Sequence, residues 1–178
     1  MLHALLTFNR LANRVADITG NLLAPMTYLM MLLTVVVVVA RYWFNIGLVP
    51  VTETIIYLHA CVFLLGIGYT LRAGAHVRVD IIYQHLSSKG QAAIDLLGAL
   101  VFLLPMTGFI LYSSIDYVGL SWRLQEGSAE PGGLPGVYLL KSLMPLMAIL
   151  LGLQGLAEIA RSLLTLFGQP PAEAMQDA

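Results

Sequence analysis

Residues 22–40 read LLAPMTYLMMLLTVVVVVA, a run of 19 residues without a charged side chain. An α-helix rises about 1.5 Å per residue, so roughly 20 residues cross the hydrocarbon core of a bilayer. Because lipid offers no hydrogen-bond partners, such a run must satisfy its backbone groups internally, as a helix does. Comparable apolar runs occupy residues 54–71, 96–115 and 142–157, the last extended by residues 159–167. The sequence therefore predicts an all-α membrane protein with four transmembrane helices.

The expected organisation has three parts. An amphipathic helix over residues 1–20 precedes a transmembrane domain over residues 21–167, and a polar tail follows over residues 168–178. The four spans are expected at about residues 22–44, 51–72, 92–120 and 137–166. Ser88 is the expected N-cap of the third helix, because a Ser followed three residues later by Gln91 has the form of a capping box.

The first helix has two distinct faces. One face carries Leu11, Val15 and Ile18, and the other carries Arg10, Asn13, Arg14 and Asp17. This spacing indicates a helix that lies in the headgroup plane, with its apolar side toward the acyl chains and its polar side toward water. A merely solvated lead-in to the first span is the alternative. Gly20 and Pro25 are expected to mark a bend between the two segments.

Charges near the ends of the spans predict the orientation. Six cations belong to one side and three to the other: Arg10, Arg14, Arg72, Arg78, Lys89 and Arg161 against Arg41, Arg123 and Lys141. Loops rich in Lys and Arg remain in the cytoplasm. We therefore expect a multi-pass protein of the cytoplasmic membrane of a bacterium or archaeon, with both termini in the cytoplasm.

Composition excludes several classes of function. The formal net charge of −1 argues against a nucleic-acid partner, which would require a concentrated basic face. Cys61 is the single cysteine, so a relay of thiols within one chain is excluded. Neither a metal-ligand spacing nor a nucleophile with its base is present, so we expect no enzymatic activity and no bound cofactor.

The densest polar segment is RAGAHVRVD at residues 72–80. It contains Arg72, Gly74, His76, Arg78 and Asp80. Two cations with an imidazole and an acid at the membrane surface suit the cytoplasmic side of a partner protein, or lipid phosphate. The alternative is simple anchoring of the span by positive charge, with a turn at Gly74.

The polar side chains within the spans favour structural roles. They are His59, Gln154, Glu158, Arg161 and Lys141. His59 has no acid within reach on its own helix and no second span offers a His for haem, so we expect a neutral imidazole hydrogen-bonded inside the bundle. Glu158 and Arg161 are spaced for an ion pair, and Lys141 is expected to extend outward to water. Since no span has an acid at its centre or a broken helix, the chain shows no transport site of its own.

Residues spread over the last three spans match one family in order and spacing. They are Arg72, Gly74, the segment HVRVD at residues 76–80, Gly108, Gly127, Ser128, Leu134, Pro135, Lys141 and Pro145. On these residues, the stretch from Tyr57 to Ala160 resembles the small, Q-type membrane subunit of tripartite ATP-independent periplasmic (TRAP) transporters.

The resemblance implies a secondary transporter with three components: a periplasmic substrate-binding protein, a large M-type membrane subunit and this small one. A cation gradient, commonly of sodium, drives the import of an organic anion in such systems. The large subunit holds the substrate and ion sites and moves as an elevator, while the small subunit is a static scaffold. The outer loop, residues 125–136, is then expected to help dock the binding protein through Glu126, Ser128 and Glu130, and membrane lipids are further partners.

Two other functions stay open on the sequence alone. The chain could be an autonomous small transporter that works as a homodimer, or the membrane anchor of a redox complex. Reconstituted by itself, a scaffold would be inert, whereas a transporter would exchange solute and a redox anchor would co-purify with a coloured cofactor.

Overall fold

The computed structural model describes residues 2–74 and 83–168, with side chains from residue 6 onward, and within these ranges every regular element is a helix. The helices are α1 (Leu2–Phe44), α2 (Val49–Arg72), α4 (Ser88–Gly98), the π-helical turn η1 (Ala99–Leu103), α5 (Leu104–Leu124) and α6 (Val137–Leu166). Because α4, η1 and α5 follow one another without a gap, they form one long helix. Four helices are thus long and apolar enough to cross a membrane, which confirms the predicted fold class.

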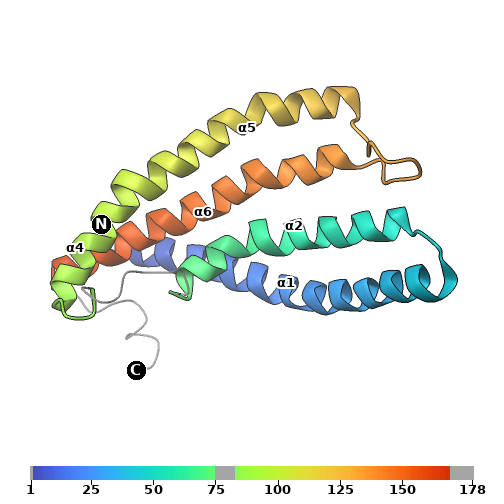
Figure 1. Ribbon diagram of the computed structural model, residues 1–178. Helices are drawn as coiled ribbons and strands as arrows, with labels where there is room; N and C mark the ends of the chain where they lie inside the picture. The colour runs from blue at the N-terminus through green and yellow to red at the C-terminus, as the bar shows by residue number, and fades with distance from the viewer. Residues whose placement is uncertain (1, 75–82, 169–178) are drawn as a thin grey trace.

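The four spans lie in a row, in the order α5, α6, α2 and α1 (Figure 1). α6 is central, because it packs against α4 and α5 on one side and against α2 and α1 on the other. The helices run roughly side by side, and their two sets of ends need names. The ends near the start of α1 and the last turn of α6 form what we call the terminal end. The opposite end, with the outer loop, is the loop end.

Small residues line the contacts of α6 with its neighbours. Gly68 of α2 lies against the backbone of Leu150, and a Cβ added at Gly155 would come within 2.8 Å of the Leu103 side chain. The buried alanines of α6 are Ala148, Ala157 and Ala160. Small side chains let helix backbones approach closely in a membrane, where van der Waals contact rather than the hydrophobic effect holds helices together.

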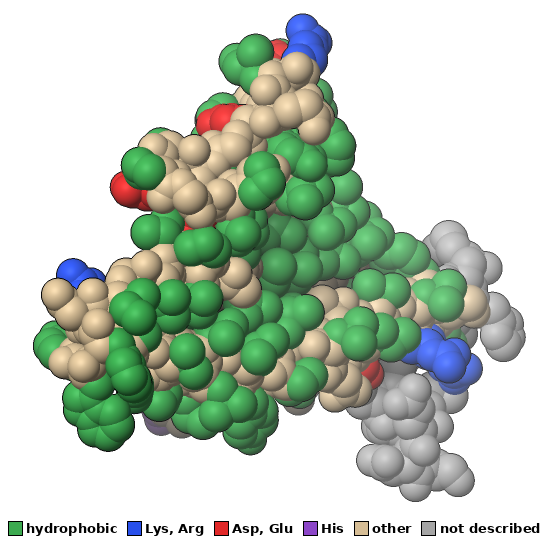
Figure 2. Space-filling view, turned by 90° about the vertical axis from the view of Figure 1, so that its right-hand side faces the viewer, with side chains coloured by type: hydrophobic (Ala, Val, Ile, Leu, Met, Phe, Trp, Pro, Cys, Tyr) green, Lys and Arg blue, Asp and Glu red, His purple; other side chains and the backbone are tan. Residues whose placement is uncertain are grey.

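Large apolar side chains point away from these contacts. Phe63, Phe102, Phe109 and Tyr112 are all largely exposed. Figure 2 views the loop end and shows hydrophobic side chains covering much of the visible surface. α1, α2 and α5 have little surface covered by other helices, so lipid or another protein must cover these side chains.

The first helix has no break between its lead-in and its span. α1 is continuous, with Pro25 inside it. Gly20 serves close packing, since a Cβ at this position would lie 2.7 Å from the ring of Tyr69 on α2. Pro25 removes one backbone donor, and membrane helices tolerate this loss because local adjustments satisfy the freed carbonyl.

The polar face of the lead-in does not face water throughout. Leu11 and Ile18 are exposed, as expected for an apolar face toward lipid. Asn9, Ala12 and Ala16 are buried and lie on a third side of the helix, between the two expected faces. On the polar face, Arg10 and Arg14 are exposed and Asn13 is half-buried. The lead-in thus has a packing side in addition to the two faces that the sequence predicts.

The start of α4 differs from the expected capping box by one residue. Ser87, not Ser88, is the N-cap, and its Oγ accepts a hydrogen bond from the Gly90 N–H at 3.3 Å. Gln91 has a different role, because its side-chain amide donates to the carbonyl oxygens of Tyr83 and Leu86.

The π-helical turn accommodates a proline. Pro105 is the second residue of α5, and a proline ring clashes with the carbonyl four residues earlier in a regular α-helix. In η1 the bonds reach one residue further back, as from the Leu104 N–H to the Ala99 carbonyl, so the wider turn leaves room for the ring. The long helix changes direction between α4 and α5 (Figure 1).

Close packing at Gly20 gives a first prediction. Gly20→Ala should destabilise the chain by about 1 kcal/mol or more, because the added methyl group meets the Tyr69 ring. Gly108→Ala is the matched control: this helical glycine faces open space, so alanine should stabilise it by about 0.5–1 kcal/mol. Thermal unfolding in detergent, followed by circular dichroism, measures both variants. A Gly20→Ala variant as stable as the original chain would contradict the packing argument.

Candidate functional site

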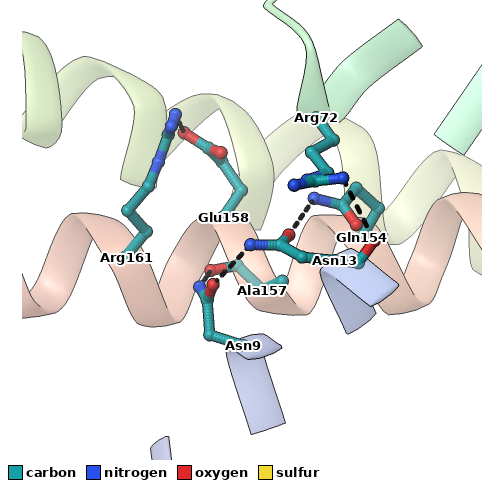
Figure 3. A pocket seen from close by; sticks show the side chains of 7 residues that line it. All are labelled: Asn9, Asn13, Arg72, Gln154, Ala157, Glu158 and Arg161. Atoms are coloured by element: carbon teal, nitrogen blue, oxygen red, sulfur yellow. Dashed lines mark hydrogen bonds and ion pairs between the residues drawn. The ribbon is translucent and has the colours of Figure 1, made fainter. Parts of the chain in front are cut away.

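Polar side chains gather between α1, α2 and α6 near the terminal end (Figure 3). This polar cluster consists of Asn9, Asn13, Arg72, Gln154, Glu158 and Arg161. The Asn9 side-chain amide donates to the Ala157 carbonyl at 3.0 Å, and that of Asn13 donates to Asn9 Oδ1 at 2.9 Å. Gln154 Nε2 donates to Asn13 Oδ1 at 3.2 Å. These bonds join α1 to α6.

Charged groups in and beside the polar cluster are paired. The Arg72 guanidinium donates to the Asn13 carbonyl at 3.3 Å and forms an ion pair with Asp17, which connects α2 to α1. On α6, Arg161 donates to the Glu158 carboxylate at 2.6 Å, and the Glu158 side chain is only 10% exposed. A charge that leaves water is tolerated when it is paired and hydrogen-bonded, and Arg161 supplies this partner for the buried Glu158 carboxylate.

The polar cluster encloses a space of about 10 Å³, close to the room that one water molecule needs. Gln154 Oε1 is buried and has no hydrogen-bond partner among the described residues. Such an unpaired acceptor costs about 1–3 kcal/mol, and a water bound beside it would remove that cost. The space is far too small for an organic anion, whereas the hydrogen bonds around it join α1 to α6.

At the loop end, Glu53 of α2 holds the outer loop. Its carboxylate accepts a hydrogen bond from Ser128 Oγ and another from the Leu134 N–H at 2.5 Å. A Cβ at Gly133 would collide with the Ser128 side chain and lie 2.6 Å from Glu53 Oε1. Glycine at position 133 therefore allows the loop to close over the carboxylate.

Glu126 connects the outer loop to α5 and α6. Lys141 Nζ donates to both carboxylate oxygens at 2.8 and 2.6 Å, and Ser121 Oγ donates at 2.7 Å. The Lys141 ammonium also lies 4.2 Å from the centre of the Tyr117 ring. The Lys141 ammonium thus contacts the Glu126 carboxylate and the Tyr117 ring, whereas the sequence predicts that it extends outward to water. The hydrogen bonds from Lys141, and then the one from Ser121, hold the pKa of Glu126 below its ordinary value of 4.5.

The three residues expected to dock a binding protein have different environments. The side chains of Glu126 and Ser128 form hydrogen bonds within the chain, to Lys141 and Glu53 respectively. Glu130 is exposed and borders a groove of about 590 Å³ between the end of α1, the start of α2 and the outer loop. Of the three, Glu130 is the one whose carboxylate faces outward.

His59 points away from the bundle. Its side chain is exposed and stacks on Phe63, with ring centres 6.1 Å apart and planes at 19°. The expectation of a histidine inside the bundle is wrong, because positions 59 and 63 share a helical stripe with the exposed Thr52 and Ile56. The side of α2 that packs on α6 carries Gly68 instead.

The segment at residues 72–80 is only partly described. Arg72 belongs to the polar cluster, and Gly74 has a φ of 64°, a left-handed conformation that suits glycine after the end of α2. His76, Arg78 and Asp80 lie outside the described residues, so their expected role at a partner or lipid surface stays a prediction.

The contacts of three residues were not anticipated from the sequence. Asn9 and Glu53 were not singled out, and Asn13 was expected on the polar face toward water. A usable signal existed for Asn9 and Asn13, because they are one turn apart and alternate along the helix with the small residues Ala12 and Ala16, which favour close packing. Glu53 stands near the start of a membrane helix, where a carboxylate has to find donors. Its partners follow 75 and 81 residues later, and no local pattern identifies them.

The lowered pKa of Glu126 predicts how the outer loop responds to acid. The ion pair contributes fully above the ordinary value of 4.5 and is lost as the pH falls through the lower value of the folded state. Trp122, which donates to Ser142 beside this contact, reports on it. In a Trp43→Phe background, Trp122 fluorescence should stay constant from neutral pH to about 4.5 and change only below. Glu126→Gln should abolish this transition; a transition that persists unchanged in this variant would contradict the assignment.

One comparison with known proteins gives a match. A protein-family model described as "Tripartite ATP-independent periplasmic transporters, DctQ component" matches residues 30–165. The matched region begins within α1 and ends within α6, so it includes parts of all four spans. No curated protein and no solved structure matches the chain. The family match extends over more than half of the chain and confirms the resemblance seen in the sequence: the chain belongs to the DctQ family, the small membrane components of TRAP transporters.

Proposed function

We propose that this chain is the static scaffold subunit of a TRAP transporter that uses a cation gradient, commonly of sodium, to import an organic anion. The family is one of transporter components and not of enzymes. In this proposal the chain works with a large M-type membrane subunit, a periplasmic substrate-binding protein and membrane lipids. The large subunit carries the substrate and ion sites.

The state of the acids carries the proposal. Glu53, Glu126 and Glu158 are each bound by donors of this chain. A coupling site needs a carboxylate that is free to exchange its cation or proton during transport. Within the described residues, no group of three or more His, Cys, Asp and Glu side chains could hold a metal ion. These observations favour a supporting role over transport by this chain alone.

The hydrogen bonds and ion pairs between helices suit a subunit that does not change conformation during transport. The polar cluster joins α1, α2 and α6 at the terminal end, while Glu53 and Glu126 join α2, α5 and α6 through the outer loop at the loop end. Helices tied at both ends resist sliding past one another. Such a body can serve as a support against which the large subunit moves.

The proposed orientation places both termini and residues 72–89 in the cytoplasm, and the outer loop in the periplasm. It follows from the excess of cations at the terminal end. The exposed carboxylate of Glu130 then faces the periplasmic binding protein, and residues 76–80 face the cytoplasmic side of the large subunit or lipid phosphate.

Reconstitution tests the scaffold role. The chain alone in liposomes should give no uptake, because Glu53, Glu126 and Glu158 are each engaged by donors of this chain. Sodium-dependent uptake should begin once the large subunit and the loaded binding protein are supplied. The measurement is radiolabelled uptake of candidate organic acids, with liposomes that hold the large subunit alone as control. Substrate-specific flux through this chain by itself would support an autonomous transporter and overturn the scaffold role.

Cysteine labelling tests the orientation. In a Cys61→Ala background, Glu130→Cys should react with a membrane-impermeant maleimide in intact cells, and Lys89→Cys should react only after the membrane is opened. Both positions are exposed, and the chain is expressed without the large subunit, so access depends on the side of the membrane and not on burial. The reverse pattern would invert the proposed orientation.

A further inference from the structure

We propose that one side of α1 and α2 near the loop end receives a transmembrane helix of the large subunit. This inference rests on the proposed function and adds to it the contact surface and the chemistry of the partner. We call this surface the groove face. It comprises Val37, Arg41, Thr52, Ile56, His59 and Phe63.

The position of His59 is the first argument. It lies ten residues after the start of α2 at Val49, which is about 15 Å along a helix, and its side chain is exposed. In the bilayer this depth belongs to the hydrocarbon. Ionisable side chains within spans almost always face protein or a water-filled cavity instead of lipid. A partner helix with a hydrogen-bond acceptor, such as a carboxylate, a hydroxyl or a carbonyl oxygen, would satisfy the imidazole.

The groove is the second argument. It is a concave surface of about 590 Å³, with Val37 and Ile56 toward the middle of the spans and Arg41 and Glu130 near the loop end. Thr52 and Ile56 line the groove and belong to the same exposed stripe of α2 as His59. A single helix lying along this stripe would therefore cover the histidine and place its end, or the loop after it, in the groove.

The third argument is charge. Arg72, Lys141 and Arg161 each pair with a carboxylate of this chain. Arg41, exposed in the last turn of α1, forms no ion pair with any described residue. It is thus available to a carboxylate of the partner at the rim of the contact, where complementary charge selects the partner and its orientation.

The outer edge of α5 is the competing surface. It exposes Phe109, Tyr112 and Asp116, on the side away from the α6 contact at Thr107. This edge is one convex helix, whereas the groove face combines two helices with a cavity. Stable interfaces bury about 1,200 Å² or more, which a concave two-helix surface supplies more readily.

Photocrosslinking in the assembled complex tests the proposal. A photoreactive phenylalanine at Ile56 or Phe63 should crosslink to the co-purified large subunit, and the same residue at Phe109 or Leu120 on α5 should not. All four native side chains are apolar and exposed, so the pairs are matched. Crosslinks confined to the α5 positions, or crosslinks of Ile56 and Phe63 to phospholipid alone, would overturn the inference.

Charge removal provides an independent readout. Arg41→Gln should lower the amount of large subunit that co-purifies by about threefold or more. Arg123→Gln, which changes a cation in the last turn of α5 at the same end, should have no effect. Circular dichroism of each variant confirms folding. Equal retention by both variants would overturn the inference, whereas a large subunit that fails to co-purify even with the unchanged chain would overturn the proposed function itself.

Discussion

Close contact along α6 is the constraint on which the rest of the structure depends. In lipid, apolar side chains gain little by meeting one another, so helices associate through van der Waals contact and polar bonds. α6 meets this condition with buried alanines and with Gly155, which leaves space for Leu103. The large side chains are consequently turned outward, and in the part of the chain that the structure describes the largest fully buried side chain is that of Ser121. Such a bundle is held by van der Waals contact between close helices, so a single methyl group added at a contact lowers its stability.

Polar bonds complete what close packing begins, and they do so at the two ends of the row. The Asn9–Asn13–Gln154 chain and the Arg72–Asp17 pair hold α1 and α2 to α6 at one end. Glu53 and Glu126 hold the outer loop at the other. Each acid gains donors that compensate for lost hydration. The same bonds engage the carboxylates of Glu53 and Glu126 within this chain, so these two acids stabilise the packing of the helices.

The arrangement of the helices also leaves hydrophobic surface that lipid or a partner protein must cover. Large hydrophobic side chains stay exposed on all four spans, and α2 carries an exposed histidine at the depth of the acyl chains. A compact four-helix bundle would have buried such a residue between helices. An arrangement in which α1, α2 and α5 each pack mainly along one side instead offers long surfaces to a second membrane protein, which agrees with membership in a family of transporter components.

The sequence by itself determined the class of the fold, the four spans and the family. These depend on runs of hydrophobic residues and on spaced motifs, which are local properties and need no knowledge of contacts. Only the tertiary structure decided which polar groups meet. Asn9 and Ala157 are 148 residues apart, and Glu53 reaches a backbone N–H 81 residues later. The same holds for His59, because the 3.6-residue period places it on a stripe, but the position of α6 decides that this stripe faces outward. Hydropathy measures how apolar a segment is, and in a membrane both the inside and the outside of a bundle are apolar, so the pattern alone cannot distinguish them.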